Sequence, residues 1–300
     1  MGLATPGASL DFPVSTQPAF RTILVPTDFS DDSMVAFAHA LRLAVSVGAE
    51  LDILHVEEGN TKSDWTWGPH VRDTLVAWGY LQPGAQPEEV GRLGIRIRKS
   101  VAAGVDAGQA IVDEVSRSHA DLVVMATHGR TGINAWLQPS VTAPLASRAS
   151  IPVLVIPHGH RGFVETASGG PSLNRVLIPV DARPHPAPAF DATALLALAL
   201  PAMDFTIATI HVGPGEVETD WIEPLPHWTI LHWTAQDGVV DSIVEAARTW
   251  DADLVVCVSE GRRGLLDAIR GSTVERLLRS LPGPLLVVPH EWGTDQIGTT

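Results

Sequence analysis

Residues 253–289 read DLVVCVSEGRRGLLDAIRGSTVERLLRSLPGPLLVVP, and this stretch decides the fold. The apolar runs at 254–258 and 285–288 each predict a buried strand, and the segment between them predicts a glycine-bearing loop followed by a helix. A loop that brings backbone N–H groups and hydroxyls to a helix N-terminus is typical of an anion site. The candidate anion ligands in this loop are Gly261, Gly264, Gly271, Ser272 and Thr273.

The same pattern occurs once more upstream, at 121–157, as DLVVMATHGRTGINAWLQPSVTAPLASRASIPVLVIP. The segments that precede these two stretches also match. The run TILVP at 22–26, followed by Asp28, corresponds to RVLIPV at 175–180, followed by Asp181. The sequence therefore predicts two copies of one folding unit.

Apolar runs alternate with helical patterns in both copies, which predicts βαβ units and a mostly parallel sheet covered by helices on both faces. We expect a Rossmann-like α/β fold with two tandem five-stranded sheets. The second copy is shorter between its second and third strands, so we expect it to lack a helix there. The expected parts are a loose arm (1–20), a first domain (21–158), a linker (159–173), a second domain (174–291) and a tail (292–300).

A parallel sheet of this kind binds ligands beyond the carboxyl ends of its strands, where the strand order reverses. Asp28 and Asp181 each follow a first strand, and each glycine loop follows a fourth strand. Each half is therefore expected to gather its aspartate and its loop on one rim of the sheet. The alternative is that the two aspartates only cap the helices that follow them.

Composition excludes several classes of function. The 300 residues carry a net charge of −14, which argues against a nucleic-acid partner. No apolar run approaches the length that spans a bilayer, and the N-terminus does not resemble a secretory signal. The single cysteine, Cys257, lies in a predicted strand and is interpreted as a core residue. We expect a cytoplasmic protein.

Short motifs recur at matching places in the two halves. Those of the first half are 25–30 (VPTDFS), 54–56 (LHV), 121–125 (DLVVM) and 127–132 (THGRTG). Those of the second half are 178–181 (IPVD), 211–212 (HV), 253–256 (DLVV) and 261–272.

These motifs resemble those of the universal stress protein family in its tandem form, over nearly the whole chain. The resemblance implies five-stranded domains in which ATP-binding members share a loop of the form G-x-x-G-(nine residues)-G-S/T. The aspartate after strand one and its neighbours then hold adenine and ribose, and the last Gly-Ser holds phosphate. It also implies that 152–157 and 284–289 pair antiparallel, forming a pseudo-dimer within the chain, and it leaves a homodimer open.

The family's loop positions are only partly kept. In the first half they read Ala126, Gly129, Pro139 and Ser140, and Pro139 offers no N–H to a phosphate. In the second half only the first glycine is replaced, by Val258. The expected ligand is ATP or ADP, held mainly by the second half, with Mg²⁺ as the only metal, arriving with the nucleotide. The expected binding residues are Thr27, Asp28, Gly129, Ser140, Val180, Asp181, Val258, Gly261, Gly264, Gly271, Ser272 and Thr273.

Three functions remain open at this point. The first is a regulatory stress protein that binds an adenine nucleotide. The second is a nucleotide-free scaffold, with degenerate loops, that binds a protein partner. The third is an enzyme, at most a slow ATPase, and it has the least support because no residue pattern supplies a nucleophile or a Walker lysine. The twelve histidines form no metal-ligand pattern, so no protein metal site is expected.

Overall fold

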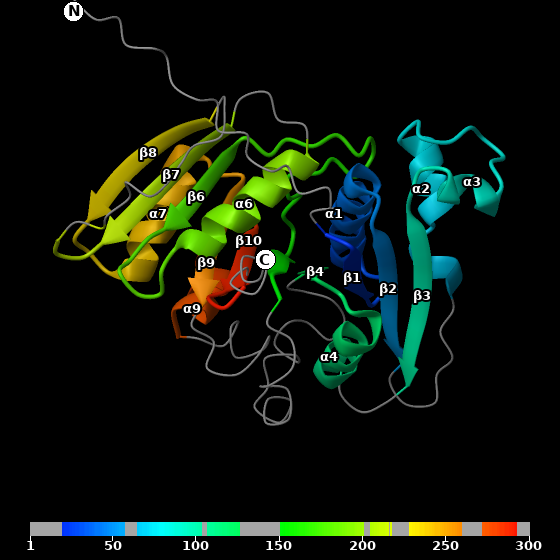
Figure 1. Ribbon diagram of the computed structural model, residues 1–300, viewed down its shortest axis with the longest axis horizontal. Helices are drawn as coiled ribbons and strands as arrows, with labels where there is room; N and C mark the ends of the chain where they lie inside the picture. Colours follow the sequence, from blue (N-terminus) through cyan, green and yellow to red (C-terminus); the bar gives the residue numbers. More distant parts are fainter. Residues whose placement is uncertain are drawn as a thin grey trace, which may run out of the picture.

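The structure, a computed structural model, places ten strands in one continuous sheet (Figure 1). It describes residues 20–57, 65–103, 107–126, 151–200, 205–215, 217, 228–259 and 272–292. The strand order is β3-β2-β1-β4-β5-β10-β9-β6-β7-β8. The strands are β1 (Thr22–Thr27), β2 (Glu50–Glu57), β3 (Arg96–Ala103), β4 (Leu122–Ala126), β5 (Val153–Ile156), β6 (Arg175–Pro179), β7 (Phe205–Val212), β8 (Trp228–Ala235), β9 (Leu254–Ser259) and β10 (Leu285–Pro289).

This strand order confirms the predicted fold class and the duplication. Reading from either end of the sheet gives the same succession of third, second, first, fourth and fifth strand of a half. All neighbours within a half are parallel. The order reverses between β1 and β4 and again between β6 and β9, which is where a sheet of this kind opens a crevice.

The two halves join through β5 and β10, the strands predicted to form the seam. They pair antiparallel, with Leu286 opposite Leu154 and Leu285 opposite Val155. Every residue of both strands is buried. The two sheets are therefore one hydrogen-bonded layer, and the predicted pseudo-dimer is confirmed.

Helices cover both faces of the sheet, as continuously apolar parallel strands require. One face carries α1, α6 and the shorter α2 and α3, and the other carries α4, α7 and α9. The described helices are α1 (Asp31–Val47), α2 (Val71–Ala77), α3 (Pro87–Gly91), α4 (Ala107–Ser118), α6 (Ala187–Ala199), α7 (Val239–Trp250) and α9 (Ser272–Ser280), with a 3₁₀ turn at Trp65–Trp67.

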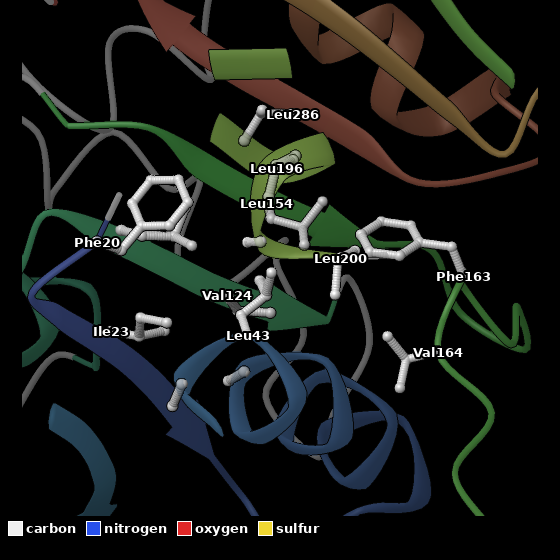
Figure 2. Packing of buried hydrophobic residues seen from close by; sticks show 14 of the residues in the cluster. Phe20, Ile23, Leu43, Val124, Leu154, Phe163, Val164, Leu196, Leu200 and Leu286 are labelled. Carbon is white, nitrogen blue, oxygen red and sulfur yellow. The ribbon is translucent and has the colours of Figure 1, made fainter. Parts of the chain in front are cut away.

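The hydrophobic core runs across the seam without a break (Figure 2). On the α1 and α6 face, Leu43 from α1 and Leu196 from α6 belong to the same buried cluster as the seam residues Leu154 and Leu286. Phe163, from the segment that connects the halves, joins this cluster as well. The halves therefore share a core and do not pack as separate bodies.

Local sequence sets the ends of α1. Ser30 is the N-cap of α1, and its side chain accepts a hydrogen bond from the Ser33 N–H at 3.2 Å. Gly48 ends the helix at φ 69°, a left-handed conformation that glycine adopts without steric cost. Asp28 accepts from the N–H and hydroxyl of Ser30 and so lies outside the helix.

A buried histidine anchors the segment between the halves. His39 of α1 is completely buried. Its Nδ1 lies 2.8 Å from the Val35 carbonyl oxygen, and its Nε2 accepts the backbone N–H groups of Phe163 and Val164. Gly162, at φ 68°, lies against the ring, where a Cβ would be 2.2 Å from Nε2. The segment at 159–173 is thus packed against α1; the domain boundaries drawn on either side of it remain a prediction.

A buried ionic network lies beneath α4, on the other face of the N-terminal half. Nη2 of Arg98 donates to Asp52 at 2.6 Å and to Glu114 at 2.7 Å, and both carboxylates are almost fully buried. The Ser100 hydroxyl donates to Asp52 at 2.8 Å, and Arg117 pairs with Glu114. Burial raises the pKa of Asp52 to about 6, against the lowering effects of Ser100 and Arg98.

Some expectations differ from the structure or fall outside it. The polar, proline-containing sequence of 57–94 predicts an irregular stretch in which residues 69–78 can form a helix. That helix is α2, but α3 at Pro87–Gly91 was not predicted, since five residues show no helical period. The arm at 1–19, the helix at 144–148, most of the loop between β7 and β8, and the tail beyond 292 lie outside the described residues.

Two leucines of α6 test the shared core. Leu196 is 1% exposed, whereas Leu198 is 71% exposed. We expect Leu196→Ala to lower the free energy of unfolding by about 3 kcal/mol, through lost burial and the cavity left behind. Leu198→Ala should change it by less than about 0.5 kcal/mol. Urea unfolding followed by circular dichroism measures both, and equal effects would contradict the assignment of Leu196 to the shared core.

The buried ring of His39 predicts an acid-sensitive stability. Burial lowers its pKa from 6.5 to about 4. Between these values the unfolded chain binds a proton that the folded chain does not, so the free energy of unfolding falls as the pH drops from about 6.5 to about 4. The loss approaches about 3 kcal/mol.

Urea unfolding at several pH values measures this loss, and His39→Gln should remove it from the pH profile. His119→Asn, at an exposed position with φ 52°, is the control that should keep it. Asp52 acts in the opposite sense, because its raised pKa gives stability in acid that is lost as the pH rises through about 6. That contribution is common to all three proteins, so it cancels in the comparison. Parallel profiles for His39→Gln and the unaltered chain would refute the role of His39.

Candidate functional site

A cavity of about 390 Å³ opens in the C-terminal half, at the carboxyl ends of three neighbouring strands. It is lined by Val180 and Asp181 after β6, by Val212 at the end of β7, and by Val258 and Ser259 at the end of β9. These strands flank the point where the strand order of this half reverses. The cavity therefore lies where an open α/β sheet binds its ligands.

The cavity brings together four of the residues predicted from the sequence. Val180, Asp181, Val258 and Thr273 all line it, although 92 positions separate Asp181 from Thr273 in the chain. Thr273 is in the first turn of α9, which begins at Ser272. Gly261, Gly264 and Gly271 lie outside the described residues, as does the side chain of Ser272.

The chemistry of the wall divides into an apolar part and a polar mouth. Ile210, Val212 and Val258 supply an apolar surface. The exposed carboxylate of Asp181 accepts the N–H of Ala182 at 2.6 Å and keeps further acceptor capacity for a ligand. The side chain does not cap a helix, because α6 begins only at Ala187. The alternative reading of Asp181 as a cap is therefore wrong.

Several lining residues were not predicted. Arg183 and Pro184 belong to the proline-rich loop after Asp181, and only the fold of that loop brings them to the cavity. Cys257 was interpreted as a core residue; it is buried, as expected, but it also lines the cavity. Its place next to Val258 at the end of a strand was the available signal. Burial raises the pKa of the Cys257 thiol to about 12.

At the equivalent rim of the N-terminal half, the side chains contact one another. The hydroxyl of Thr27 lies 3.0 Å from that of Ser33 and accepts the N–H of Phe29. The Phe29 ring stacks on His55 with centroids 4.1 Å apart, and Trp65 packs edge-on against Phe29. Gly129 and Ser140, the other residues predicted for this half, lie outside the described residues.

The histidines near the ends of β2 and β7 contact backbone carbonyl groups. Nδ1 of His55 lies 2.8 Å from the Thr27 carbonyl oxygen, and Nδ1 of His211 lies 3.2 Å from that of Val180. In both halves the ring therefore ties the end of the second strand to the end of the first. Among the described residues, Nε2 of His211 is buried without a hydrogen-bond partner.

Fold and cavity together define a class. The chain is a duplicated, doubly wound α/β protein with a ligand-sized cavity at the switch point of one half. A family model described as the universal stress protein family matches residues 19–157 and 234–289. The chain belongs to the universal stress protein family.

Known relatives cover one or both halves. Universal stress protein Rv2005c of Mycobacterium tuberculosis is 25% identical over 296 residues, covering 88% of this chain and 96% of that protein. Universal stress protein MJ0531 of Methanocaldococcus jannaschii is 29% identical over 141 residues, which are 46% of this chain and 82% of that protein. The crystal structure of a universal stress protein from Archaeoglobus fulgidus matches the fold with a TM-score of 0.55 at 18% identity, covering 91% of this chain and 97% of that one.

No helix within the described residues combines the length and the apolar character that crossing a bilayer requires.

The position of Cys257 predicts a slow thiol. With its pKa near 12, the buried group holds very little thiolate at pH 8. We expect an aromatic disulfide reagent to react at least roughly a hundredfold more slowly with the folded chain than with the chain in guanidinium. Absorbance of the released thiol measures both rates. Because Cys257 is the single cysteine, Cys257→Ser is the blank. Equal rates would contradict the burial.

Proposed function

We propose that this chain is a regulatory protein of the stress response that binds an adenine nucleotide, ATP or ADP, in the cavity of its C-terminal half. The observation that carries the proposal is the convergence of Val180, Asp181, Val258 and Thr273 on one cavity at the switch point. Sequence separates these residues widely, so their convergence is a property of the fold.

The described residues fit such a ligand. A cavity of about 390 Å³ is within the usual range for small-molecule sites. Ile210, Val212 and Val258 offer an apolar wall to a planar base. The Asp181 carboxylate can accept hydrogen bonds from ribose hydroxyls, as acidic residues do at other nucleotide sites. Thr273 and the guanidinium of Arg183 provide donors at the mouth.

The remaining parts of the proposal rest on sequence. Gly261, Gly264, Gly271 and Ser272 would complete the phosphate end, with backbone N–H groups meeting the anion. Mg²⁺ would enter with the nucleotide, bound to its phosphate oxygens. We further propose a cytoplasmic location. A protein partner or a second copy of the chain would contact a surface other than the seam.

We propose that the N-terminal half does not bind nucleotide tightly. The hydroxyl of Thr27 and the carboxylate of Asp28 already have intramolecular partners. Pro139 stands where a glycine N–H would meet a phosphate, and proline has no such donor. One nucleotide per chain is the expected stoichiometry.

Calorimetric titration of the full chain with ATP and with ADP tests the proposal. We expect about one site per chain. Val258→Phe, which fills the apolar wall, should weaken binding at least about tenfold, and Asp181→Asn should weaken it by a similar factor through the lost charged hydrogen bonds.

Asp28→Asn is the matched control in the other half and should leave the affinity unchanged. A folded protein that gives no heat at high micromolar nucleotide would refute nucleotide binding and favour the interaction scaffold. An affinity that Asp28→Asn reduces and Asp181→Asn does not would place the site in the wrong half.

A further inference from the structure

A second, larger hollow lies in the N-terminal half, away from the nucleotide rim of the other half. It measures about 670 Å³ and is bordered by β3 and by helices α2 and α3. β3 is an edge strand, since it pairs with β2 alone in the described sheet. Figure 1 shows α2 and α3 beside β3 at the end of the sheet opposite β8. We call this hollow the β3 groove.

The wall of the β3 groove is apolar. Val71 of α2, Val90 of α3 and Ile95, just before β3, are all buried members of the core cluster that includes α1. Ile97 is partly buried against the same cluster and also lines the groove. An apolar wall of this extent, open to solvent on one side, can accept the hydrocarbon part of a ligand.

Cations surround this wall. Arg72, Arg96 and Lys99 line the groove, with a single carboxylate, Asp73. Side chains alternate along a strand, so Lys99 shares the face of Ile97, whereas Arg96 shares the opposite face with Arg98 and borders the groove only at its edge. The whole chain has a net charge of −14. A positive groove on an acidic protein is a local feature that favours an anionic ligand.

The cations have few internal partners. The Nε of Arg72 is 4.0 Å from the carboxylate of Asp73, at the limit of an ion pair. Nζ of Lys99 donates to the Pro69 carbonyl oxygen at 3.0 Å and lies 4.7 Å from the centroid of the Trp65 ring. Partial burial there lowers the pKa of Lys99. Within the described residues no carboxylate forms an ion pair with Arg96 or Lys99.

The fold itself does not require these charges. The positions of β3 and β8 can be matched through the equivalent histidines His55 and His211 of the neighbouring strands. His55 lies opposite Val101 of β3, and His211 lies opposite Thr234 of β8, so Val101 and Thr234 are equivalent positions. By this register Arg96 corresponds to Thr229 and Lys99 to His232, whereas Ile97 corresponds to another isoleucine, Ile230. The shared fold keeps the apolar residue, and the cations are particular to the N-terminal half.

We propose that the β3 groove is a second ligand site, which takes a small amphipathic organic anion. Its acidic group meets Arg72 and Lys99, and its apolar body lies against the valines and isoleucines of the wall. Arginine binds carboxylates and related oxyanions through paired hydrogen bonds, which suits this arrangement. The site is separate from the nucleotide cavity, so it gives the protein a second input from a different class of molecule.

Fluorescence titration of the full chain with 8-anilinonaphthalene-1-sulfonate, an amphipathic anion, tests this site. We expect saturable binding to one site that decanoate displaces and that added salt weakens. The double variant Arg72→Gln/Lys99→Gln should weaken binding at least about tenfold, and Arg72→Gln alone should weaken it by a smaller factor. Arg72 and Lys99 both lie at the surface, so the variants should keep a thermal unfolding temperature close to that of the unaltered chain.

Two controls locate the probe. Arg92→Gln, at an exposed position next to α3 but outside the groove lining, and His232→Gln, at the position equivalent to Lys99, should leave the affinity unchanged. Val258→Phe should also leave it unchanged, which separates this site from the nucleotide cavity. No saturable binding to the unaltered chain, the same affinity in the double variant, or loss of binding in Val258→Phe would each overturn the proposal.

Discussion

The antiparallel pairing of β5 with β10 is the interaction on which the rest of the structure depends. Its residues alternate between the two faces of the sheet, so that Leu154 and Leu286 enter one core and Val153, Val155, Leu285 and Val287 enter the other. The seam therefore joins both helical layers as well as the sheet. The seam lies at the fifth strand of each half, so each half keeps its own switch point, and the cavity proposed for the nucleotide is lined by residues of the C-terminal half.

Duplication left the framework of the two halves alike and their polar chemistry different. Asp121 and Asp253 are equivalent residues, because each accepts N–H groups at the start of the first strand of its half. Counting back from these two residues matches the positions of α4 with those of α7. By that alignment Glu114 corresponds to Ala246. By the register of the edge strands, Arg98 corresponds to Leu231.

The buried ionic network of the N-terminal half is thus replaced in the C-terminal half by apolar residues, which pack against the core cluster of that face. A buried ion pair is seldom more stabilising than the apolar packing that replaces it, so both versions hold the same fold. This tolerance explains how two halves with a common framework can carry different cavities, one at the switch point of the C-terminal half and one beside β3 in the N-terminal half.

The sequence was sufficient for the features that depend on local pattern. Continuous apolar runs identified the buried strands, and the resemblance of the motifs to the universal stress protein family predicted the seam between 152–157 and 284–289. It was not sufficient where tertiary placement decides. The short helix α3 shows no period of its own, Arg183 reaches the cavity only through the path of its loop, and the β3 groove exists because α2 and α3 lie beside an edge strand.

The covalent link between the halves changes the thermodynamics of the seam. Two separate chains joined through the same strands would part on dilution, with an occupancy set by their concentration. Here the partner strand is always present at the effective concentration that the connecting segment provides, and His39 holds that segment in place. The assembly state of the two halves is therefore independent of how much protein is made, and one half can lose a ligand without the pair coming apart.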